Sequence, residues 1–394
     1  MFHKIFFSLI LTTITASAIG ETGFEAIANN NTYDPVREIT IKYQSKSPAL
    51  IELAKKAQES TAAGKREDAK RLVADIVKRY PDCSLAYLWW AEFDIEDKNW
   101  HSAVEKLSKS IELDESNRRA LHLRAATYNV LKQYREALRD FSKILEASPD
   151  DVHFRALRAG VLSNAGDHNR ALEELNKAVD ESNRDVEILL RRAGCFLAAK
   201  NPIAAHADFR EVLESTPKNA DANAGMALLL TQLSRDTEAI HYWAIAIEGM
   251  PSNANWYMCR GYCRQNLGEF RDALKDYRKA VQIDPNTIKS LNSLAICLSI
   301  CDDPTLRDLS EAEEVAKKSL KLSAEQSWES LQAMAIVLSQ GRHFNEAIEY
   351  QDKCLAQAPK KDQDRLSNQR AAYVQGKTYA EFRKESDPRT AKSN

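Results

Sequence analysis

Small residues recur along the chain at a constant interval, and this interval constrains the fold more than any other feature of the sequence. One series of alanines is spaced by about 34 residues: Ala69, Ala103, Ala137, Ala171, Ala205, Ala239 and Ala273. A second series keeps the same step: Ala57, Ala91, Ala125, Ala159, Ala193, Ala227 and Gly261. Such a period predicts a linear array of small units, each of which packs on its neighbours.

Each period is predicted to form two short helices. In residues 254–287, the first helix carries Gly261, a turn follows at Gly268, and the second helix carries Ala273. Pro285 ends the second helix because proline cannot continue an α-helix. The apolar and small residues give each helix one face that must be buried against the other helix.

This pattern resembles the tetratricopeptide-repeat (TPR) family over residues 50–361. The resemblance implies an all-α fold, a right-handed α-solenoid of tandem helix-turn-helix repeats whose concave surface docks a peptide or a partner protein. We expect about nine repeats, with an enlarged turn at 300–308 in the eighth. A capping helix is predicted at 362–382, because the last repeat would otherwise expose its apolar face. Residues 383–394 are predicted to be a disordered tail.

The amino-terminal residues predict export. Lys4 precedes an apolar run at 5–14, and Ala16 to Ala18 offers a small-x-small cleavage pattern, so residues 1–18 are predicted to be a signal peptide. The mature chain would be periplasmic or secreted. The alternative is an uncleaved anchor, which would make the protein a membrane-anchored subunit of an envelope assembly complex. Residues 19–49 are predicted to be a linker, with a turn at Asp34-Pro35 and a short strand or extended segment at 38–43.

Charge and composition exclude several classes of function. The formal net charge is −2 and no basic stripe is present, so we expect no nucleic-acid partner. No Ser/His/Asp set, Cys/His set or phosphate-binding glycine loop has motif support, so we expect no enzymatic activity and no cofactor. Three of the seven cysteines, Cys195, Cys263 and Cys297, share one position of the first helix, which favours core packing over metal ligation.

An arginine and an acidic residue occur together in four repeats. The arginine precedes the small residue of the first helix, and the acid lies on the second helix of the same repeat. Repeats without the arginine also lack the acid. This covariation within one chain predicts a bidentate ion pair between the two helices, a structural role rather than a ladder for a charged ligand. The residues are Arg124, Asp140, Arg158, Glu174, Arg192, Asp208, Arg260 and Asp276.

The TPR resemblance also indicates which positions of the first helix line the concave surface. The polar, aromatic and sulfur-containing side chains there suit an extended peptide whose backbone is hydrogen-bonded by amides. The candidate partner-binding residues are Arg119, His122, Asn129, His153, Asn164, Met258, Tyr262, Gln265, Asn266 and Asn292. Ala54 and Gln58 stand where the chaperone-docking members of the family carry Lys and Asn, which disfavours chaperone tails as ligands. A groove filled by the chain's own linker or tail is another alternative.

The sequence therefore predicts a non-enzymatic protein-interaction scaffold. A metal or small-ligand carrier that uses His122 and His153 is a further alternative, although no third ligand is evident and no metal site is assigned. The partner, the pathway and the oligomeric state have no signal in the sequence.

Overall fold

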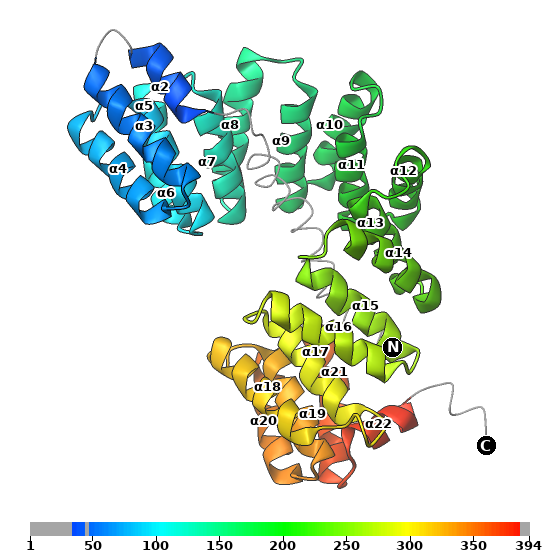
Figure 1. Cartoon of the computed structure of the whole chain (residues 1–394). Coiled ribbons are helices and arrows are strands. Elements are labelled where there is room, and N and C mark those ends of the chain that lie inside the picture. The colour runs from blue at the N-terminus through cyan, green and yellow to red at the C-terminus, as the bar shows by residue number, and fades with distance from the viewer. Residues whose placement is uncertain (1–33, 44–46, 387–394) are drawn as a thin grey trace. The chain divides into compact units, whose positions relative to one another are not determined.

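The structure is a computed structural model of the 394-residue chain, and it describes residues 34–43 and 47–386. The described residues form 21 α-helices and no strand. The first helix is α2 (Pro35–Tyr43), and the next eighteen form nine consecutive pairs (Figure 1). We call the first helix of each pair helix A and the second helix B. The all-α prediction is confirmed for this part of the chain.

The nine pairs follow the predicted repeats. The first five are α3 (Pro48–Ala62) with α4 (Arg66–Arg79), α5 (Ser84–Glu96) with α6 (Trp100–Leu113), α7 (Arg118–Val130) with α8 (Tyr134–Ala147), α9 (Val152–Asn164) with α10 (His168–Glu181), and α11 (Val186–Ala198) with α12 (Pro202–Ser215). The last four are α13 (Ala220–Gln232) with α14 (Asp236–Gly249), α15 (Ala254–Asn266) with α16 (Phe270–Ile283), α17 (Ile288–Ile300) with α18 (Leu309–Leu322), and α19 (Trp328–Gln340) with α20 (Phe344–Gln357).

The two series of small residues lie where the helices of a repeat cross. Every alanine of both series is fully buried. At Gly261, an added Cβ would lie 3.0 Å from the ring of Tyr277 and 3.2 Å from Cβ of Asp276 on the facing helix. A larger side chain at these positions would push the two helices apart, which explains why the sequence keeps them small.

The turn between helices A and B has a backbone conformation that recurs from repeat to repeat. One residue in each of the first seven turns has a positive φ, a conformation that costs a non-glycine residue energy. Three of these residues are glycines, and the other four are lysines or a serine: Gly64, Lys98, Lys132, Gly166, Lys200, Ser234 and Gly268. The turn therefore has one backbone geometry throughout, and packing of the helices holds it even where glycine is absent.

Side-chain caps start many of the A helices. Asn117, Asp151 and Asn219 each accept a hydrogen bond from the backbone N–H three residues later, as an N-cap does. These caps are 34 or 68 residues apart, so the start of helix A keeps the same register as the alanines. The eighth repeat has a longer connection between its helices, where the carbonyl of Cys301 accepts a hydrogen bond from Nε of Arg307 at 2.9 Å.

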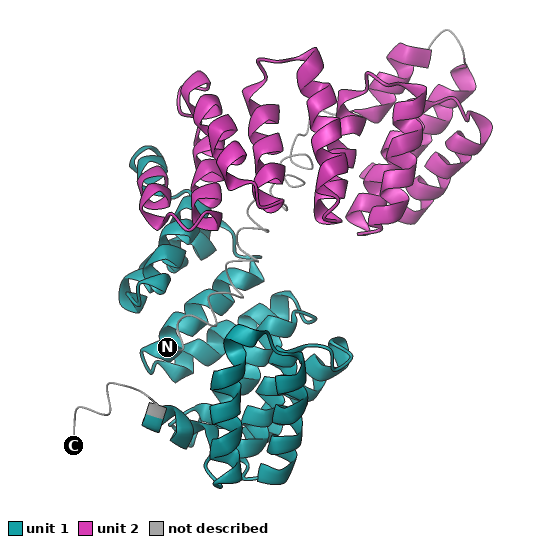
Figure 2. Ribbon diagram, turned by 180° about the vertical axis from the view of Figure 1, so that it is seen from behind, with its two compact units in different colours: residues 1–8, 209–394 teal, residues 9–208 magenta. Residues whose placement is uncertain are grey.

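The chain divides into two compact units, whose described parts are residues 34–43 with 47–208, and residues 209–386 (Figure 2). The boundary falls inside α12. Each unit is considered separately below, as the amino-terminal unit and the carboxyl-terminal unit.

The predicted linker at 19–49 contains a helix, so that prediction is wrong for its described part. Oδ1 of Asp34 accepts hydrogen bonds from the backbone N–H groups of Val36 and Arg37, which makes Asp34 an N-cap with proline at the first helical position. The buried side chains of α2 are Val36, Ile39 and Tyr43, spaced as one helical face. Helix α2 packs on α3 and α5 and covers the first repeat.

The carboxyl-terminal cap is two helices rather than the single predicted helix. They are α21 (Lys360–Val374) and α22 (Tyr379–Ser386). The chain turns at Gly376, whose φ is +72°, and Leu366 and Tyr373 are buried against the last repeat. Residues 383–386 belong to α22, which corrects the predicted start of the disordered tail. The rest of that tail and the predicted signal peptide lie outside the described residues. No helix of the described part is long and apolar enough to cross a membrane.

The four predicted Arg–acid pairs are in contact. Arg124 meets Asp140 through two hydrogen bonds of 2.7 Å, and the three other pairs have N–O distances of 2.7–2.9 Å. Two of the arginines also reach the preceding repeat: Arg124 donates to Oγ of Ser108, and Arg192 donates to Oδ1 of Asn176, both at 3.0 Å. These pairs therefore also join neighbouring repeats.

The second repeat uses a different interaction at the same two positions. Trp90 stands in place of the arginine and Lys106 in place of the acid, and Nζ of Lys106 lies 4.4 Å from the centroid of the Trp90 ring. A cation–π contact therefore replaces the ion pair between helices A and B.

We predict that Asp208→Asn lowers the free energy of unfolding of the chain by about 2–4 kcal/mol, because the largely buried guanidinium of Arg192 loses its counter-charge. Urea unfolding followed by circular dichroism measures this change. Asp150→Asn, at an exposed position, is the matched control and should change stability by less than about 0.5 kcal/mol. Equal stability of the two variants would contradict a structural role for the pair.

Candidate peptide-binding face

In the amino-terminal unit, the A helices of successive repeats are joined by polar side chains on one face. Nε of Arg119 on α7 donates to Oε1 of Glu92 on α5 at 2.8 Å. Nδ2 of Asn164 on α9 donates to Oδ1 of Asn129 on α7 at 3.1 Å. Both bonds run from helix A to helix A, with Arg119 at the start of α7 and Asn129 at its end. We call the part of the A helices that carries these four residues the A-helix face.

The side chains of the Arg119–Glu92 ion pair are partly buried. The side chain of Arg119 is 27% exposed and that of Glu92 is 20% exposed. Burial raises the pKa of Glu92 from its ordinary value of 4.5 to about 7, although the charge of Arg119 acts in the opposite direction. The carboxyl group of Glu92 therefore changes between its protonated and ionised forms near pH 7.

His122 lies on α7, three residues after Arg119. Its ring packs on Phe154 with centroids 5.1 Å apart and on Phe141 with centroids 5.9 Å apart. Burial, together with the charges of Arg119 and Arg191, lowers the pKa of His122 to about 4, so the imidazole is neutral at pH 7. Within the described residues its Nε2 is buried without a hydrogen-bond partner.

His153 is exposed, in contrast to His122. The described residues contain no group of three or more His, Cys, Asp or Glu side chains that could hold a metal ion. The carrier alternative based on these two histidines therefore gains no support from the surroundings of either ring.

Asn129 and Asn164 are the predicted residues whose chemistry best suits a peptide backbone. Both are partly exposed. Their mutual bond uses one donor of Asn164 and one acceptor of Asn129, whereas each amide group can form about four hydrogen bonds. The pair can therefore bond an extended chain that lies across α7 and α9.

The candidates in the carboxyl-terminal unit are less accessible. Met258, Tyr262 and Asn292 are buried in this structure, and their role in partner binding stays a prediction. Asn292 is used within the core, where its Oδ1 accepts a hydrogen bond from Oγ of Ser319 at 2.7 Å and its Nδ2 lies 3.4 Å from Oγ of Ser330.

The reason for this burial lies in the repeat. Met258 and Asn292 both stand four residues after the start of helix A. Leu88 and Ala156 occupy the same position in two other repeats and are also buried. In Asn292 this position places the amide between helix B of its own repeat and helix A of the next, so the polar side chain is bonded within the core.

Two further candidates of this unit are partly exposed and bonded to neighbouring side chains. Oε1 of Gln265 accepts a hydrogen bond from the hydroxyl of Tyr277 at 3.0 Å. Nδ2 of Asn266 donates to Oδ2 of Asp236 at 3.3 Å. These contacts connect the end of α15 to its own helix B and to the preceding repeat.

All seven cysteines are buried free thiols. Burial raises the pKa of Cys259, Cys297 and Cys354 to about 12, so these thiols stay protonated near neutral pH. Their burial agrees with the predicted packing role.

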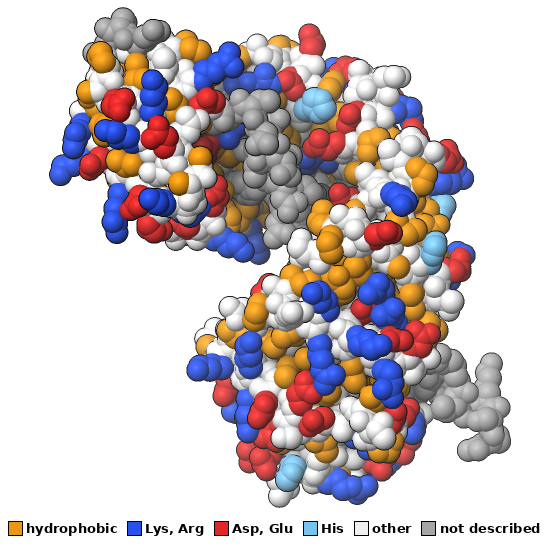
Figure 3. Space-filling model, viewed as in Figure 1, with side chains coloured by type: hydrophobic (Ala, Val, Ile, Leu, Met, Phe, Trp, Pro, Cys, Tyr) orange, Lys and Arg blue, Asp and Glu red, His pale blue; other side chains and the backbone are white. Residues whose placement is uncertain are grey.

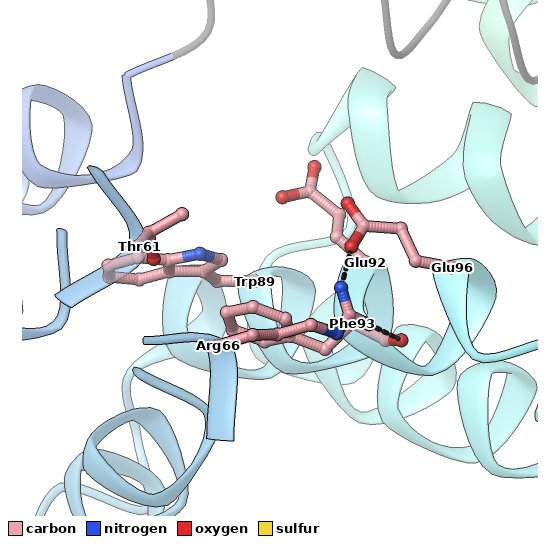
Figure 4. A pocket seen from close by; sticks show the side chains of 6 residues that line it. All are labelled: Thr61, Arg66, Trp89, Glu92, Phe93 and Glu96. Carbon is pink, nitrogen blue, oxygen red and sulfur yellow. Dashed lines mark hydrogen bonds and ion pairs between the residues drawn. The ribbon is translucent and has the colours of Figure 1, made fainter. Parts of the chain in front are cut away.

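Sequence reasoning missed a pocket of about 260 Å³ at the amino-terminal end of the A-helix face (Figure 4). It is formed by the end of α3, the start of α4 and the second half of α5. The lining residues are Thr61, Arg66, Trp89, Glu92, Phe93 and Glu96. A signal was present in the sequence, because Trp89 and Phe93, and likewise Glu92 and Glu96, are four residues apart and so share a helix face.

The visible surface carries charges of both signs. Figure 3 shows Lys and Arg side chains interspersed with Asp and Glu over α3 and α4. A mixed surface of this kind has no large single-sign field to attract a nucleic-acid backbone.

Comparisons with known proteins agree with this architecture. One tetratricopeptide-repeat family model matches residues 254–287 and another matches residues 130–193. A DnaJ homolog subfamily C member 7 homolog from Dictyostelium discoideum is 28% identical over 130 residues, which cover 32% of this chain and 21% of that protein. The chain thus spans about a fifth of the length of that curated relative.

Solved structures show the same fold at low sequence identity. A tetratricopeptide-repeat protein from Parabacteroides merdae has a TM-score of 0.57 and 17% identity, and the match covers 64% of this chain and all of that one. A chain of the Cut9–Hcn1 hetero-tetramer of the APC/C has a TM-score of 0.51 and 15% identity, over 86% of this chain and 74% of that one.

The two matches identify residues 130–193 and 254–287 as tetratricopeptide repeats, and the tandem helix pairs of the described residues have the fold that such repeats form. Such repeats support a role as a protein-interaction scaffold, and the A-helix face is the surface on which this role can be tested.

We predict that Glu92→Gln flattens the pH dependence of stability. The folded state keeps the proton of Glu92 up to a higher pH than the unfolded state does, so this carboxyl favours unfolding increasingly as the pH rises from about 4.5 to about 7. Over that window it should remove about 2–4 kcal/mol of stability from the wild type and none from the variant. Urea unfolding at several pH values measures this difference, and parallel pH profiles for the two proteins would contradict it.

Proposed function

We propose that the protein is an exported interaction scaffold that holds an extended peptide segment of a partner protein along the A-helix face of the amino-terminal unit. The observation that carries the proposal is the pair of partly exposed amides, Asn129 and Asn164, on successive A helices. Side-chain amides hydrogen-bond a peptide backbone without requiring a particular sequence.

The neighbouring side chains suit the same role. Arg119 and Glu92 continue the polar surface towards α5, and the exposed imidazole of His153 lies at the start of α9. A bound segment that follows this surface would meet donors, acceptors and both signs of charge. Such a face can fix the register of a peptide without catalytic groups.

Export is the second part of the proposal, and it rests on the sequence. The apolar run at 5–14 and the small residues Ala16 and Ala18 have the arrangement of a cleavable signal. The partner would then be met in the periplasm or outside the cell. An uncleaved amino terminus would instead hold the scaffold at a membrane, as part of an envelope assembly.

We predict that a photo-cross-linking amino acid placed at 153 or 164 captures a partner segment, whereas the same group at Arg139, an exposed position on helix B, does not. Cross-linked peptides identified by mass spectrometry give the readout. Asn129→Ala in the cross-linking protein should reduce the yield several-fold because the backbone contacts weaken. Cross-links from 139 alone would place the interface on the opposite helices and contradict the proposal.

We predict that the chain recovered from its native cells lacks residues 1–18. Intact mass measurement distinguishes the processed chain from the full-length one. A full-length chain recovered with the membrane fraction would contradict cleavage and favour the anchored alternative.

A further inference from the structure

We propose that the pocket lined by Thr61, Arg66, Trp89, Glu92, Phe93 and Glu96 takes the cationic side chain of a lysine or arginine from the bound peptide. The inference rests on the proposed function and deepens it, because it names the chemistry of one peptide residue and the place where it binds.

The pocket lies on the same surface as the proposed peptide site. Glu92 is shared between the two, since it lines the pocket and accepts the hydrogen bond from Arg119 on α7. A peptide segment that contacts Arg119 on α7 would therefore lie beside the pocket at α5.

The walls of the pocket favour the stem of a long side chain. Trp89 and Phe93 are one helical turn apart on α5, and both line the cavity. In Figure 4 their rings lie below the carboxylate of Glu92, and Thr61 is close to Trp89. Aromatic rings of this kind attract a cation through their faces and pack against the methylene groups that carry it.

Glu92 favours a positive charge at the end of that stem, whereas the carboxylate of Glu96 is already paired with Arg66. Glu92 and Glu96 are also one turn apart on α5 and line the same cavity. Arg119 bonds Oε1 of Glu92, and a carboxylate has acceptor capacity for further donors. The raised pKa of Glu92 indicates that its negative charge is under-compensated by the surrounding groups.

Arg66 does not turn the pocket into an anion site, because its guanidinium is already engaged. It bonds the carboxylate of Glu96, the carbonyl of Phe93 at 3.0 Å and the carboxylate of Asp97 at 2.7 Å. It also lies 5.3 Å from the centroid of the Phe93 ring. Arg66 therefore acts as a wall that positions Phe93 and Glu96.

The groups around Glu92 determine how the site should respond to pH. Arg119 faces it from α7, Glu96 lies on its own helix α5, and Arg66 lines the cavity from α4. Burial raises the pKa of Glu92 to about 7, although the charge of Arg119 lowers it. The affinity for a cation should therefore rise as the pH increases from 6 to 8 and Glu92 ionises.

The test uses the whole chain and two peptides. The probe is acetyl-Gly-Ser-Lys-Ser-Gly-amide, and the matched control has norleucine in place of lysine, which keeps the stem and removes the charge. Isothermal calorimetry gives the affinity, and the indole N–H signal of Trp89, assigned with Trp89→Phe, gives the location. We expect the lysine peptide to bind at least five-fold more tightly than the norleucine peptide at pH 8, and to shift the Trp89 signal.

Variants of the pocket separate charge from shape. Glu92→Gln should lower the affinity for the lysine peptide at least five-fold, and it should remove the rise in affinity between pH 6 and 8. Glu105→Gln, an equal change of charge at an exposed position of α6, should leave both unchanged. Thr61→Met should block the pocket through bulk alone, and its side chain is exposed, so the helix can accept the change.

Equal binding of the lysine and norleucine peptides, or unchanged binding to Glu92→Gln, would overturn the inference. This failure is distinct from failure of the proposed function, which depends on cross-links from positions 153 and 164. If those cross-links form while both peptides bind alike, the scaffold role stands and the cation pocket is wrong.

Discussion

Close contact between helices A and B is the constraint on which the rest of this structure depends. It is made by fully buried small residues that recur in one frame, such as Ala125 with Ala137 in the third repeat. Because a side chain larger than alanine would separate the helices, every repeat adopts the same internal geometry. Identical units then stack with the same neighbours, so one face of each helix A is brought beside the next. The polar pairs Arg119–Glu92 and Asn164–Asn129 are consequences of this stacking.

Polar contacts between the helices vary more freely than the small residues do. The Arg124–Asp140 position is an ion pair in four repeats and a cation–π contact between Lys106 and Trp90 in another. In the sixth repeat the same two positions hold Met226 and Tyr242. The frame therefore tolerates several chemistries at this site, provided that the two side chains match each other. Because the two positions change together from repeat to repeat, comparison of the repeats within one sequence was enough to recognise the pairs.

Much of the fold could be predicted from the sequence because its period is exact. The expected repeat at 254–287 begins at the first residue of α15, and α13, α11, α9 and α7 begin at successive steps of 34 residues before it. Helix α2 was missed because Asp34-Pro35 favours both a turn and an N-cap with proline behind it, and the sequence alone does not decide between them. The exposure of individual side chains on the A-helix face was harder to predict: Asn292 has the chemistry of a surface amide, but its amide bonds Ser330 of the next repeat. The pocket beside Trp89 depends on how three helices meet, which periodicity does not specify.

The central claim is that the A helices of the amino-terminal unit form the binding face. Hydrogen exchange measured by mass spectrometry on the chain, with and without a captured partner segment, tests it most directly. The account predicts slower exchange in α5, α7 and α9 on binding and unchanged exchange in α6, α8 and α10. Protection of the B helices with unchanged exchange in the A helices would contradict it.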